Sequence, residues 1–212
     1  EAPADADPYD RLRMTAAGDG FAYDLTLTAE GPLVLHGEGG YSVKSDRGHA
    51  SHYYSQPAFR AEGRLTLQGR EIAVTGRAWL DREWSSQPLD ADQTGWDWFS
   101  ISLDDGTRLM LFQVRKADGR RARTVGTRVA PNGRVTPLDG EGIVMAPTGY
   151  ADVRGRETPV RWRIEVPDFG IALDTRPLNP QSWNDLGVPY WEGPVFVEGS
   201  HQGRGYLEMT GY

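Results

Sequence analysis

Residues 96–115, WDWFSISLDDGTRLMLFQVR, decide the fold class of this 212-residue chain. From Trp98 to Leu103 the side chains alternate between polar or aromatic and strictly apolar, which is the period-2 pattern of a β-strand with one buried face. The turn sequence Asp104-Asp105-Gly106 follows, and residues 109–115 supply a second apolar strand. The segment therefore predicts an antiparallel hairpin.

The same pattern recurs on both sides of this hairpin. Residues 64–80 alternate around Gln68-Gly69-Arg70, and further alternating stretches run at residues 21–28, 160–166 and 206–212. No window of 11 or more residues that is free of Gly and Pro follows the helical period. Many short strands separated by turn residues predict an all-β protein, with an antiparallel sandwich or barrel as its architecture.

Composition and charge exclude several classes of function. The chain has 23 basic and 30 acidic residues, a net charge of −7, and this argues against a nucleic-acid or anionic-membrane partner. It has no cysteine, which excludes a disulfide framework and thiol catalysis. The Gly-x-Ser-x-Gly elbow, the phosphate-binding glycine loop and the dinucleotide fingerprint are also missing from the sequence, so we expect no cofactor.

Residues 78–84, AWLDREW, carry the densest set of chemical groups. Strand geometry places Trp79, Asp81 and Glu83 on one face, opposite Ala78 and Leu80. Two carboxylates at this spacing beside indole rings are a candidate acid–base pair, because burial and a neighbouring like charge both raise the pKa of a carboxyl group. The competing interpretation is a solvent-facing strand end that carries two surface carboxylates.

Residues 49–55, HASHYYS, hold a second candidate. His49 and His52 are spaced by three residues without a third ligand, so we expect no metal site. His52 and Tyr53 are better read as polar groups that line a pocket. A structured linker with buried tyrosine rings is the alternative.

The hairpin at residues 96–115 adds aromatic candidates. Trp96 and Trp98 share one face and would form an aromatic wall of a cavity, although core packing explains them equally well. Gln113 lies between apolar neighbours on the facing strand, and a polar residue there favours a pocket over a solid core.

Two further tryptophans lie beside carboxylates. Trp191 precedes Glu192 in the sequence PYWEG at residues 189–193, and Trp84 closes the AWLDREW segment. Indole faces stabilise cations. We therefore include Trp84, Trp191 and Glu192 among the candidate substrate-binding residues.

Several blocks together resemble a known family. They are GYS at 40–42, HYYS at 52–55, GRAWLDREWSS at 76–86, GWDWF at 95–99, DDG at 104–106, YWEG at 190–193 and GYLEMTGY at 205–212. They resemble the AttH-like "predicted secreted hydrolase" proteins, which are relatives of carotenoid 1,2-hydratase (hydroxyneurosporene synthase), over about residues 21–212.

This resemblance implies two lipocalin-like β-barrel domains with a ligand site near their junction. We expect residues 1–56 to be the C-terminal part of a first lipocalin-like domain with a linker, and residues 57–212 to be a nearly complete second one. The missing N-terminal part of the first domain would then be a partner of this chain. The resemblance also implies a periplasmic or secreted location.

The hydratase branch of the family carries its catalytic aspartate in an aromatic-x-Asp block that aligns with Trp79-Leu80-Asp81. The resemblance thus implies that Asp81 is a general acid and Trp79 its aromatic neighbour. Glu83 stands where the hydratases have a characteristic asparagine, which is a departure from their pattern.

Three hypotheses follow. In the first, Asp81 protonates an apolar, isoprenoid- or lipid-like ligand, indole rings shelter the resulting cation, and Glu83 orients the water that captures it. In the second, the protein is a non-catalytic, lipocalin-like module of the cell envelope that binds a lipid or pigment. In the third, the tryptophans only fill a core. Fold analogy alone does not choose between them.

Overall fold

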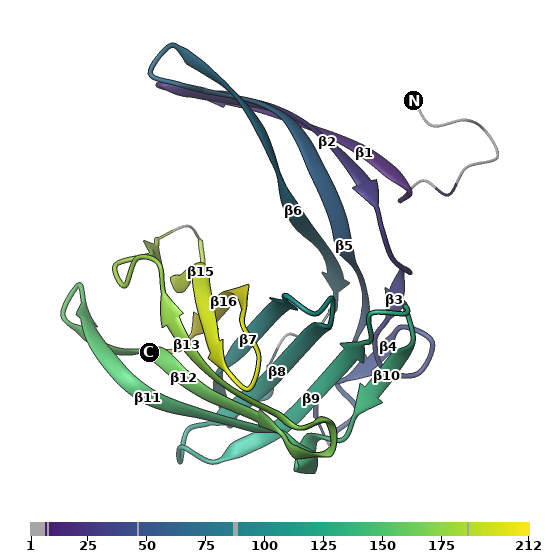
Figure 1. The fold of residues 1–212 in the computed structure, drawn as a ribbon. Helices are drawn as coiled ribbons and strands as arrows, with labels where there is room; N and C mark the ends of the chain where they lie inside the picture. Colours follow the sequence, from purple (N-terminus) through teal and green to yellow (C-terminus); the bar gives the residue numbers. More distant parts are fainter. Residues whose placement is uncertain (1–6, 8, 46, 87–88, 186) are drawn as a thin grey trace. The chain divides into compact units, whose positions relative to one another are not determined.

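A computed structural model of the protein describes residues 7, 9–45, 47–86, 89–185 and 187–212 (Figure 1). It contains β-strands and two 3-10 helices, and it divides into two compact units. The first unit comprises Glu1–Gly40 and His52–Trp84, and the second comprises Tyr41–Ser51 and Ser85–Tyr212. The predicted all-β, antiparallel class is confirmed. Within the described residues, no helix has the length and hydropathy that a bilayer crossing requires.

The first unit is built on a sheet with the strand order β1-β2-β5-β3, in which β6 also pairs with β5. Its strands are β1 (Arg11–Gly18), β2 (Phe21–Ala29), β3 (Val34–Leu35), most of β5 (Ala50–Leu67) and β6 (Arg70–Trp84). The predicted hairpin at residues 64–80 joins β5 to β6. Its turn residues Gln68 and Gly69 both have positive φ, 49° and 76°, which is the backbone of a tight hairpin turn that matches strand twist.

A bulge divides β5 into two halves. Gln56 pairs with Leu80 and Phe59 with Ala78, so three steps along β5 oppose two steps along β6. Pro57 lies inside the bulge, where a residue without an N–H group is tolerated. Odd-numbered residues of β5 therefore point to one face of the sheet before the bulge and to the other face after it.

The bulge separates a small core from a polar face. Beyond it, Phe59 packs with Leu27 and Ala61, and Ala78 and Leu80 of β6 lie against this cluster. Before it, odd-numbered residues of β5 face the odd-numbered residues of β6. This geometry agrees with the predicted opposition of Asp81 to Ala78 and Leu80.

The second unit is built on a ten-stranded antiparallel sheet with the order β10-β9-β8-β7-β16-β15-β13-β12-β11, to which β14 adds beside β15. The sheet curls strongly into a half-barrel (Figure 1). The prediction of a barrel or sandwich is thus confirmed only as this curled sheet, because no pairing between the described residues joins β10 to β11. The elements of this unit are β4 (Tyr41–Val43), β7 (Gln93–Leu103), β8 (Arg108–Lys116), β9 (Arg121–Val129), β10 (Val135–Leu138), η1 (Gly140–Gly142), β11 (Val144–Val153), β12 (Arg156–Val166), η2 (Pro167–Phe169), β13 (Ile171–Pro177), β14 (Trp183–Asn184), β15 (Tyr190–Gly199) and β16 (Gly203–Thr210).

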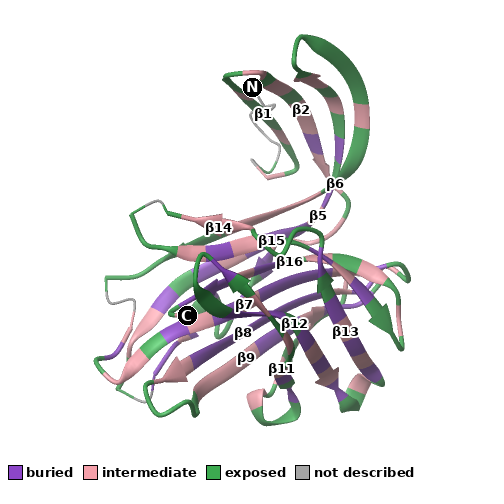
Figure 2. Ribbon diagram, turned by 90° about the vertical axis from the view of Figure 1, so that its left-hand side faces the viewer, coloured by how far each residue is buried: buried purple, intermediate pink, exposed green. Residues whose placement is uncertain are grey.

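One hydrophobic core fills the inside of the curl. The alternating apolar residues of β7, β8, β12, β13, β15 and β16 contribute most of it, and Figure 2 shows their buried positions in purple. The hairpin predicted from residues 96–115 is β7–β8, with Phe99 opposite Leu111 and both side chains fully buried.

The predicted domain boundary after residue 56 falls within β5, at the bulge. The assignment of residues 1–56 and 57–212 to two lipocalin-like domains stays a prediction, and so does the missing part of the first domain.

Candidate functional site

Three side chains donate hydrogen bonds to the carboxyl group of Asp81, all from the same face of β5 and β6. Trp79 Nε1 donates to Asp81 Oδ1 at 2.8 Å, and the Tyr53 hydroxyl donates to Oδ2 at 3.1 Å. The Ser55 hydroxyl donates a very short bond to Oδ1. Ser55 pairs with Asp81 across the ladder, and strand alternation places Tyr53 and Trp79 beside this pair.

A histidine extends this network from the adjacent strand. His36 follows β3, and its backbone N–H donates to the carbonyl oxygen of Tyr53 at 3.0 Å, which fixes it beside β5. Its Nε2 lies 2.7 Å from Ser55 Oγ, and its ring lies 4.2 Å from the Tyr53 ring, centre to centre. We call His36, Tyr53, Ser55, Trp79 and Asp81 the Asp81 network.

Burial controls the electrostatics of Asp81. Desolvation raises its pKa, and the Glu83 carboxylate raises it further, while the bonds from Ser55, Trp79 and Tyr53 act in the opposite direction without cancelling the rise. Among the described residues, no Arg or Lys forms an ion pair with Asp81. Asp81 is therefore a half-buried carboxyl group that holds its proton more tightly than usual and has only neutral donors around it.

Glu83 lies on the same face as Asp81 and is the more exposed of the two. It pairs with Tyr53 across the β5–β6 ladder. The structure thus places Trp79, Asp81 and Glu83 on one face, as the alternation predicted, and adds Tyr53, which the sequence analysis placed in a separate candidate segment. The chemical roles of all four residues stay predictions.

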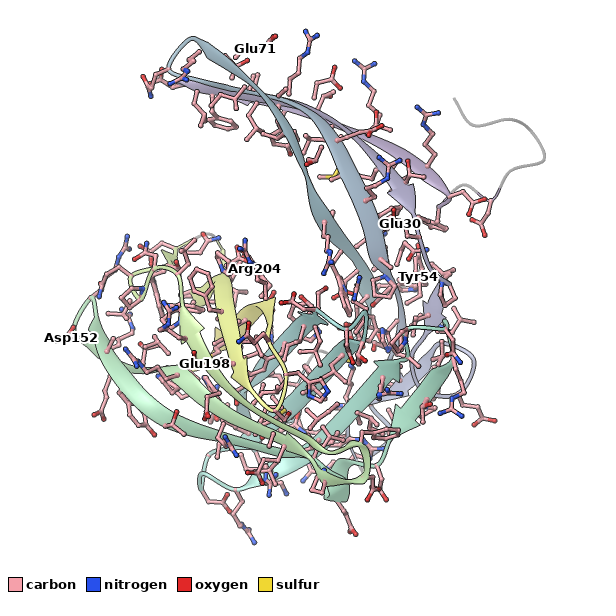
Figure 3. All side chains as sticks on the ribbon, viewed as in Figure 1. Glu30, Tyr54, Glu71, Asp152, Glu198 and Arg204 are labelled. Carbon is pink, nitrogen blue, oxygen red and sulfur yellow. The ribbon has the colours of Figure 1, made fainter. Side chains whose placement is uncertain are left out.

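His52 and Trp84 occupy the opposite face of the same two strands. They are cross-strand partners, and their rings stack with centres 5.5 Å apart. Tyr54, marked in Figure 3, meets Trp84 edge to face at 6.0 Å. His52 and Trp84 therefore do not line the same site as Asp81, because consecutive residues of a strand point to opposite faces.

The second unit contains another buried carboxyl group, Asp97 of β7, which has no exposed surface. Gln113 Nε2 and Arg115 Nε approach Asp97 Oδ2 at 2.8 and 3.1 Å, and the Tyr212 hydroxyl donates to Oδ1 at 2.9 Å. Burial raises the pKa of Asp97 against the opposing effects of Arg115 and of these bonds. Gln113, predicted as a pocket residue, thus lies in a buried ion-pair network.

Trp96 and Trp98 lie on the other face of β7, where they share one side as predicted. Trp96 Nε1 donates to Glu208 Oε1 at 2.8 Å, and Trp98 pairs with Glu208 across β7 and β16. Glu208 in turn lies opposite Glu192 of β15. Burial and the Glu192 carboxylate raise the pKa of Tyr206 to about 12. Whether Trp96, Trp98 and Glu192 contact a ligand stays a prediction.

Trp191 is fully buried in the core of the second unit. Its Nε1 donates to the carbonyl oxygen of Pro180 at 2.8 Å. This placement favours the core-packing interpretation of Trp191 over a role in ligand binding.

No group of three or more His, Asp or Glu side chains is placed to hold a metal ion among the residues that the structure describes. His49 lies instead beside Asp90, with His49 Nδ1 3.0 Å from Asp90 Oδ1.

Sequence reasoning missed His36, Ser55 and the buried role of Asp97. His36 lies outside the segments that the sequence analysis singled out, and Ser55 lies in the HYYS segment without an assigned role. Non-local strand pairing brings both residues to Asp81. The signal available in the sequence was the alternation that places Tyr53 and Ser55 on one face of their strand; their meeting with Asp81 depends on the register of β5 against β6.

Comparison with known proteins places these observations in a family. The model of the AttH-like family matches residues 2–212. The search of the curated proteins finds no match.

Two solved structures are similar to the chain. One is a crystal structure from Nitrosomonas europaea assigned as an AttH, with a TM-score of 0.87 and 36% sequence identity over 96% of this chain. The other is kievitone hydratase from Nectria haematococca, with a TM-score of 0.76 and 18% identity over 95% of this chain, a likeness that shows the fold alone. The chain spans 66% and 64% of the lengths of these two structures.

Proposed function

The chain belongs to the AttH-like family, and we propose that it carries a hydratase-type site in which Asp81 transfers a proton to an apolar, isoprenoid- or lipid-like alkene. The observation that carries this proposal is the environment of Asp81. Its pKa is raised by burial although three neutral groups donate to it, and no described Arg or Lys pairs with it. A carboxyl group of this kind keeps a proton that it can give to a substrate.

The proposed reaction balances simply. Asp81 gives its proton to one alkene carbon, which leaves a carbocation on the other. A water molecule adds to this carbon and loses a proton, which restores the proton that Asp81 gave, so that the net change is the addition of water. The ring of Trp79, which is held by its bond to Asp81, offers a π-face to the cation. Glu83 is proposed to orient the water, because it presents a second carboxylate on the same face.

The comparisons support this proposal without testing it. Kievitone hydratase has the same fold at 18% identity, and this likeness does not identify the substrate of the present chain. Trp96 and Trp98 remain further candidates for ligand contact. The predicted periplasmic or secreted location and the partner domain also remain proposals.

The test is a hydration assay on the purified chain in water enriched in ¹⁸O. Kievitone and the linear isoprenoids farnesol and squalene serve as probes, and mass spectrometry detects a product that has gained one labelled water. We expect Asp81→Asn to lower the rate by about 10²-fold or more. Binding, followed by tryptophan fluorescence, should change by no more than a few-fold.

The matched control is Asp24→Asn, the same substitution at an exposed strand carboxylate of the same unit that pairs with Arg13. It should leave the rate unchanged. Equal rates for Asp81→Asn and the wild type would contradict the proposal. Binding of a probe without any labelled product would support the non-catalytic binding module instead.

A further inference from the structure

Ser55 lies between two titratable side chains, His36 and Asp81. Its Oγ is 2.7 Å from His36 Nε2 and also bonds Asp81 Oδ1. Ser55 has no exposed surface, and only 2% of His36 is exposed. Water therefore competes little for these bonds, and the three groups form a continuous series of hydrogen bonds from His36, directly after β3, through Ser55 of β5 to Asp81 of β6.

A serine hydroxyl carries one proton, so the protons in the hydrogen bonds from His36 through Ser55 to Asp81 have two consistent arrangements. In one, neutral His36 accepts from Ser55 and Ser55 accepts from protonated Asp81. In the other, His36 Nε2–H donates to Ser55 and Ser55 donates to the Asp81 carboxylate. The two arrangements differ by a concerted shift of two protons, and the net effect moves one proton from Asp81 to His36.

We infer that His36 and Asp81 share one proton through Ser55, and that His36 is a positioning residue that returns a proton to Asp81 between turnovers. This inference rests on the proposed function of Asp81. When Asp81 has given the shared proton to the substrate, Asp81 is a carboxylate and His36 is neutral. His36 then takes up the proton that the captured water loses and becomes imidazolium. It releases its Nε2 proton to Ser55 Oγ as Ser55 passes its own proton to Asp81 Oδ1, so the pair again holds one shared proton and all protons balance.

Two other side chains on this face affect the same hydrogen bonds, and the experiment must distinguish their effects from that of the shared proton. Tyr53 donates to Asp81 Oδ2 and packs its ring against His36. The Glu83 carboxylate raises the pKa of Asp81. These two are the remaining titratable side chains that β5 and β6 present on this face before the bulge. Neither lies between His36 and Asp81, so a change at Ser55 isolates the shared proton.

The experiment is a pH titration of the whole chain by NMR, with ¹³C labels in aspartate carboxyl groups and ¹⁵N labels in histidine rings. In the wild type, the Asp81 and His36 signals should each show two inflections at the same two pH values, as expected for coupled groups. In Ser55→Ala, each signal should show one inflection at its own pH. Ser100→Ala, which removes another buried serine from the second unit, should behave as the wild type.

Two more variants protect the test against a folding defect in Ser55→Ala. Ser55→Thr keeps the hydroxyl group and should restore the shared inflections. His36→Gln removes the titrating ring and should leave Asp81 with a single inflection. Independent single inflections in the wild type, or shared inflections that persist in Ser55→Ala, would overturn the inference.

The outcomes separate this inference from the proposed function. If the wild type shows shared inflections but Asp81→Asn hydrates the probes at the wild-type rate, the shared proton stands and the proposed function fails. If Asp81→Asn is inactive but the inflections are independent, the proton-donor role stands and the relay is wrong. If both hold, the pH profile of kcat in Ser55→Ala should lose one inflection while KM changes less than about three-fold.

Discussion

Asp81 and Asp97 lie on strands of different units, and burial raises the pKa of both. Their partners differ. Asp97 is fully buried against the Arg115 guanidinium, whereas Asp81 is half-buried and receives bonds from a tryptophan, a serine and a tyrosine. The charge of Asp97 is neutralised by an ion pair, but the charge that Asp81 gains on ionisation is only solvated by neutral dipoles.

This difference separates a carboxyl group that stabilises the fold from one that is suited to proton transfer. An ion pair loses much of its stability when either partner changes its charge. A carboxyl group among neutral donors can gain or lose a proton without leaving a buried countercharge behind. Asp97 therefore fits a role in holding β7, β8 and the C-terminal Tyr212 together, and Asp81 fits a role in proton transfer.

The largest expected effect is on folding stability at the ion pair. Asp97→Asn leaves the Arg115 side chain, which is only 14% exposed, without a countercharge. We expect the free energy of unfolding in urea to fall by about 3 kcal/mol or more. The same substitution at Asp81 should change it by less than about 1 kcal/mol. Similar losses of unfolding free energy in Asp97→Asn and Asp81→Asn would contradict a structural role that belongs to Asp97 alone.

A smaller effect concerns how stability depends on pH. Because the pKa of Asp81 is raised in the folded state, its contribution is fully present below the unfolded pKa of about 3.9 and is lost as the pH rises through the folded pKa. Asp81→Asn should remove this loss, so its stability relative to the wild type should increase with pH across that window. Urea unfolding at a series of pH values measures the difference.

For Asp24→Asn we expect the stability relative to the wild type to change with pH in the opposite direction. The Arg13 guanidinium lowers the pKa of Asp24, so this group stabilises the fold above its unfolded pKa and loses that contribution as the pH falls. A common pH slope for the two variants would contradict the assigned environments.

A third effect tests the neutral donors one at a time. Trp79→Phe removes the indole N–H that favours ionised Asp81, so the pKa of Asp81 should rise further, at a stability change of about 1 kcal/mol. Tyr53→Phe should shift it in the same direction. Trp84→Phe lies on the same strand but on the opposite face and should leave the Asp81 carboxyl titration, followed by ¹³C NMR, as in the wild type.

The smallest effect lies on the outer face of the second unit. Glu192→Gln removes a carboxylate that raises the pKa of Tyr206, so this pKa should fall from about 12 toward 10. Ultraviolet absorbance at alkaline pH reports the change. Glu165→Gln, which removes a carboxylate paired with Arg163 instead, is the matched control and should leave the Tyr206 titration unchanged.

Local alternation predicted much of the fold. The strands around Gln68-Gly69 and Asp104-Asp105-Gly106 were predictable because each hairpin is a local contact with its own turn. The curl of the second sheet was not, since it depends on pairings such as β7 with β16, whose residues are far apart in the sequence.

The candidate site was predictable only where its residues share one strand. Trp79 and Asp81 follow from the alternation of β6, and the same alternation excludes Trp84 from their face. His36 and Ser55 could not be assigned to Asp81, because their position depends on the non-local ladder of β3, β5 and β6. The distinct role of Asp97 depends on Arg115, whose partner no local pattern identifies.

The bulge in β5 makes the strand tolerant of some changes and intolerant of others. One residue fewer between Gln56 and Phe59 would leave two steps of β5 opposite two steps of β6, so Ser55 and Phe59 could both keep their partners, Asp81 and Ala78, in a regular ladder. One residue fewer elsewhere in β5 would instead shift the register and move one side of the strand to the opposite face. The bulge is thus the place where β5 can lose one residue without losing its cross-strand partners, and the cost of that loss is the local bend and twist that the bulge supplies.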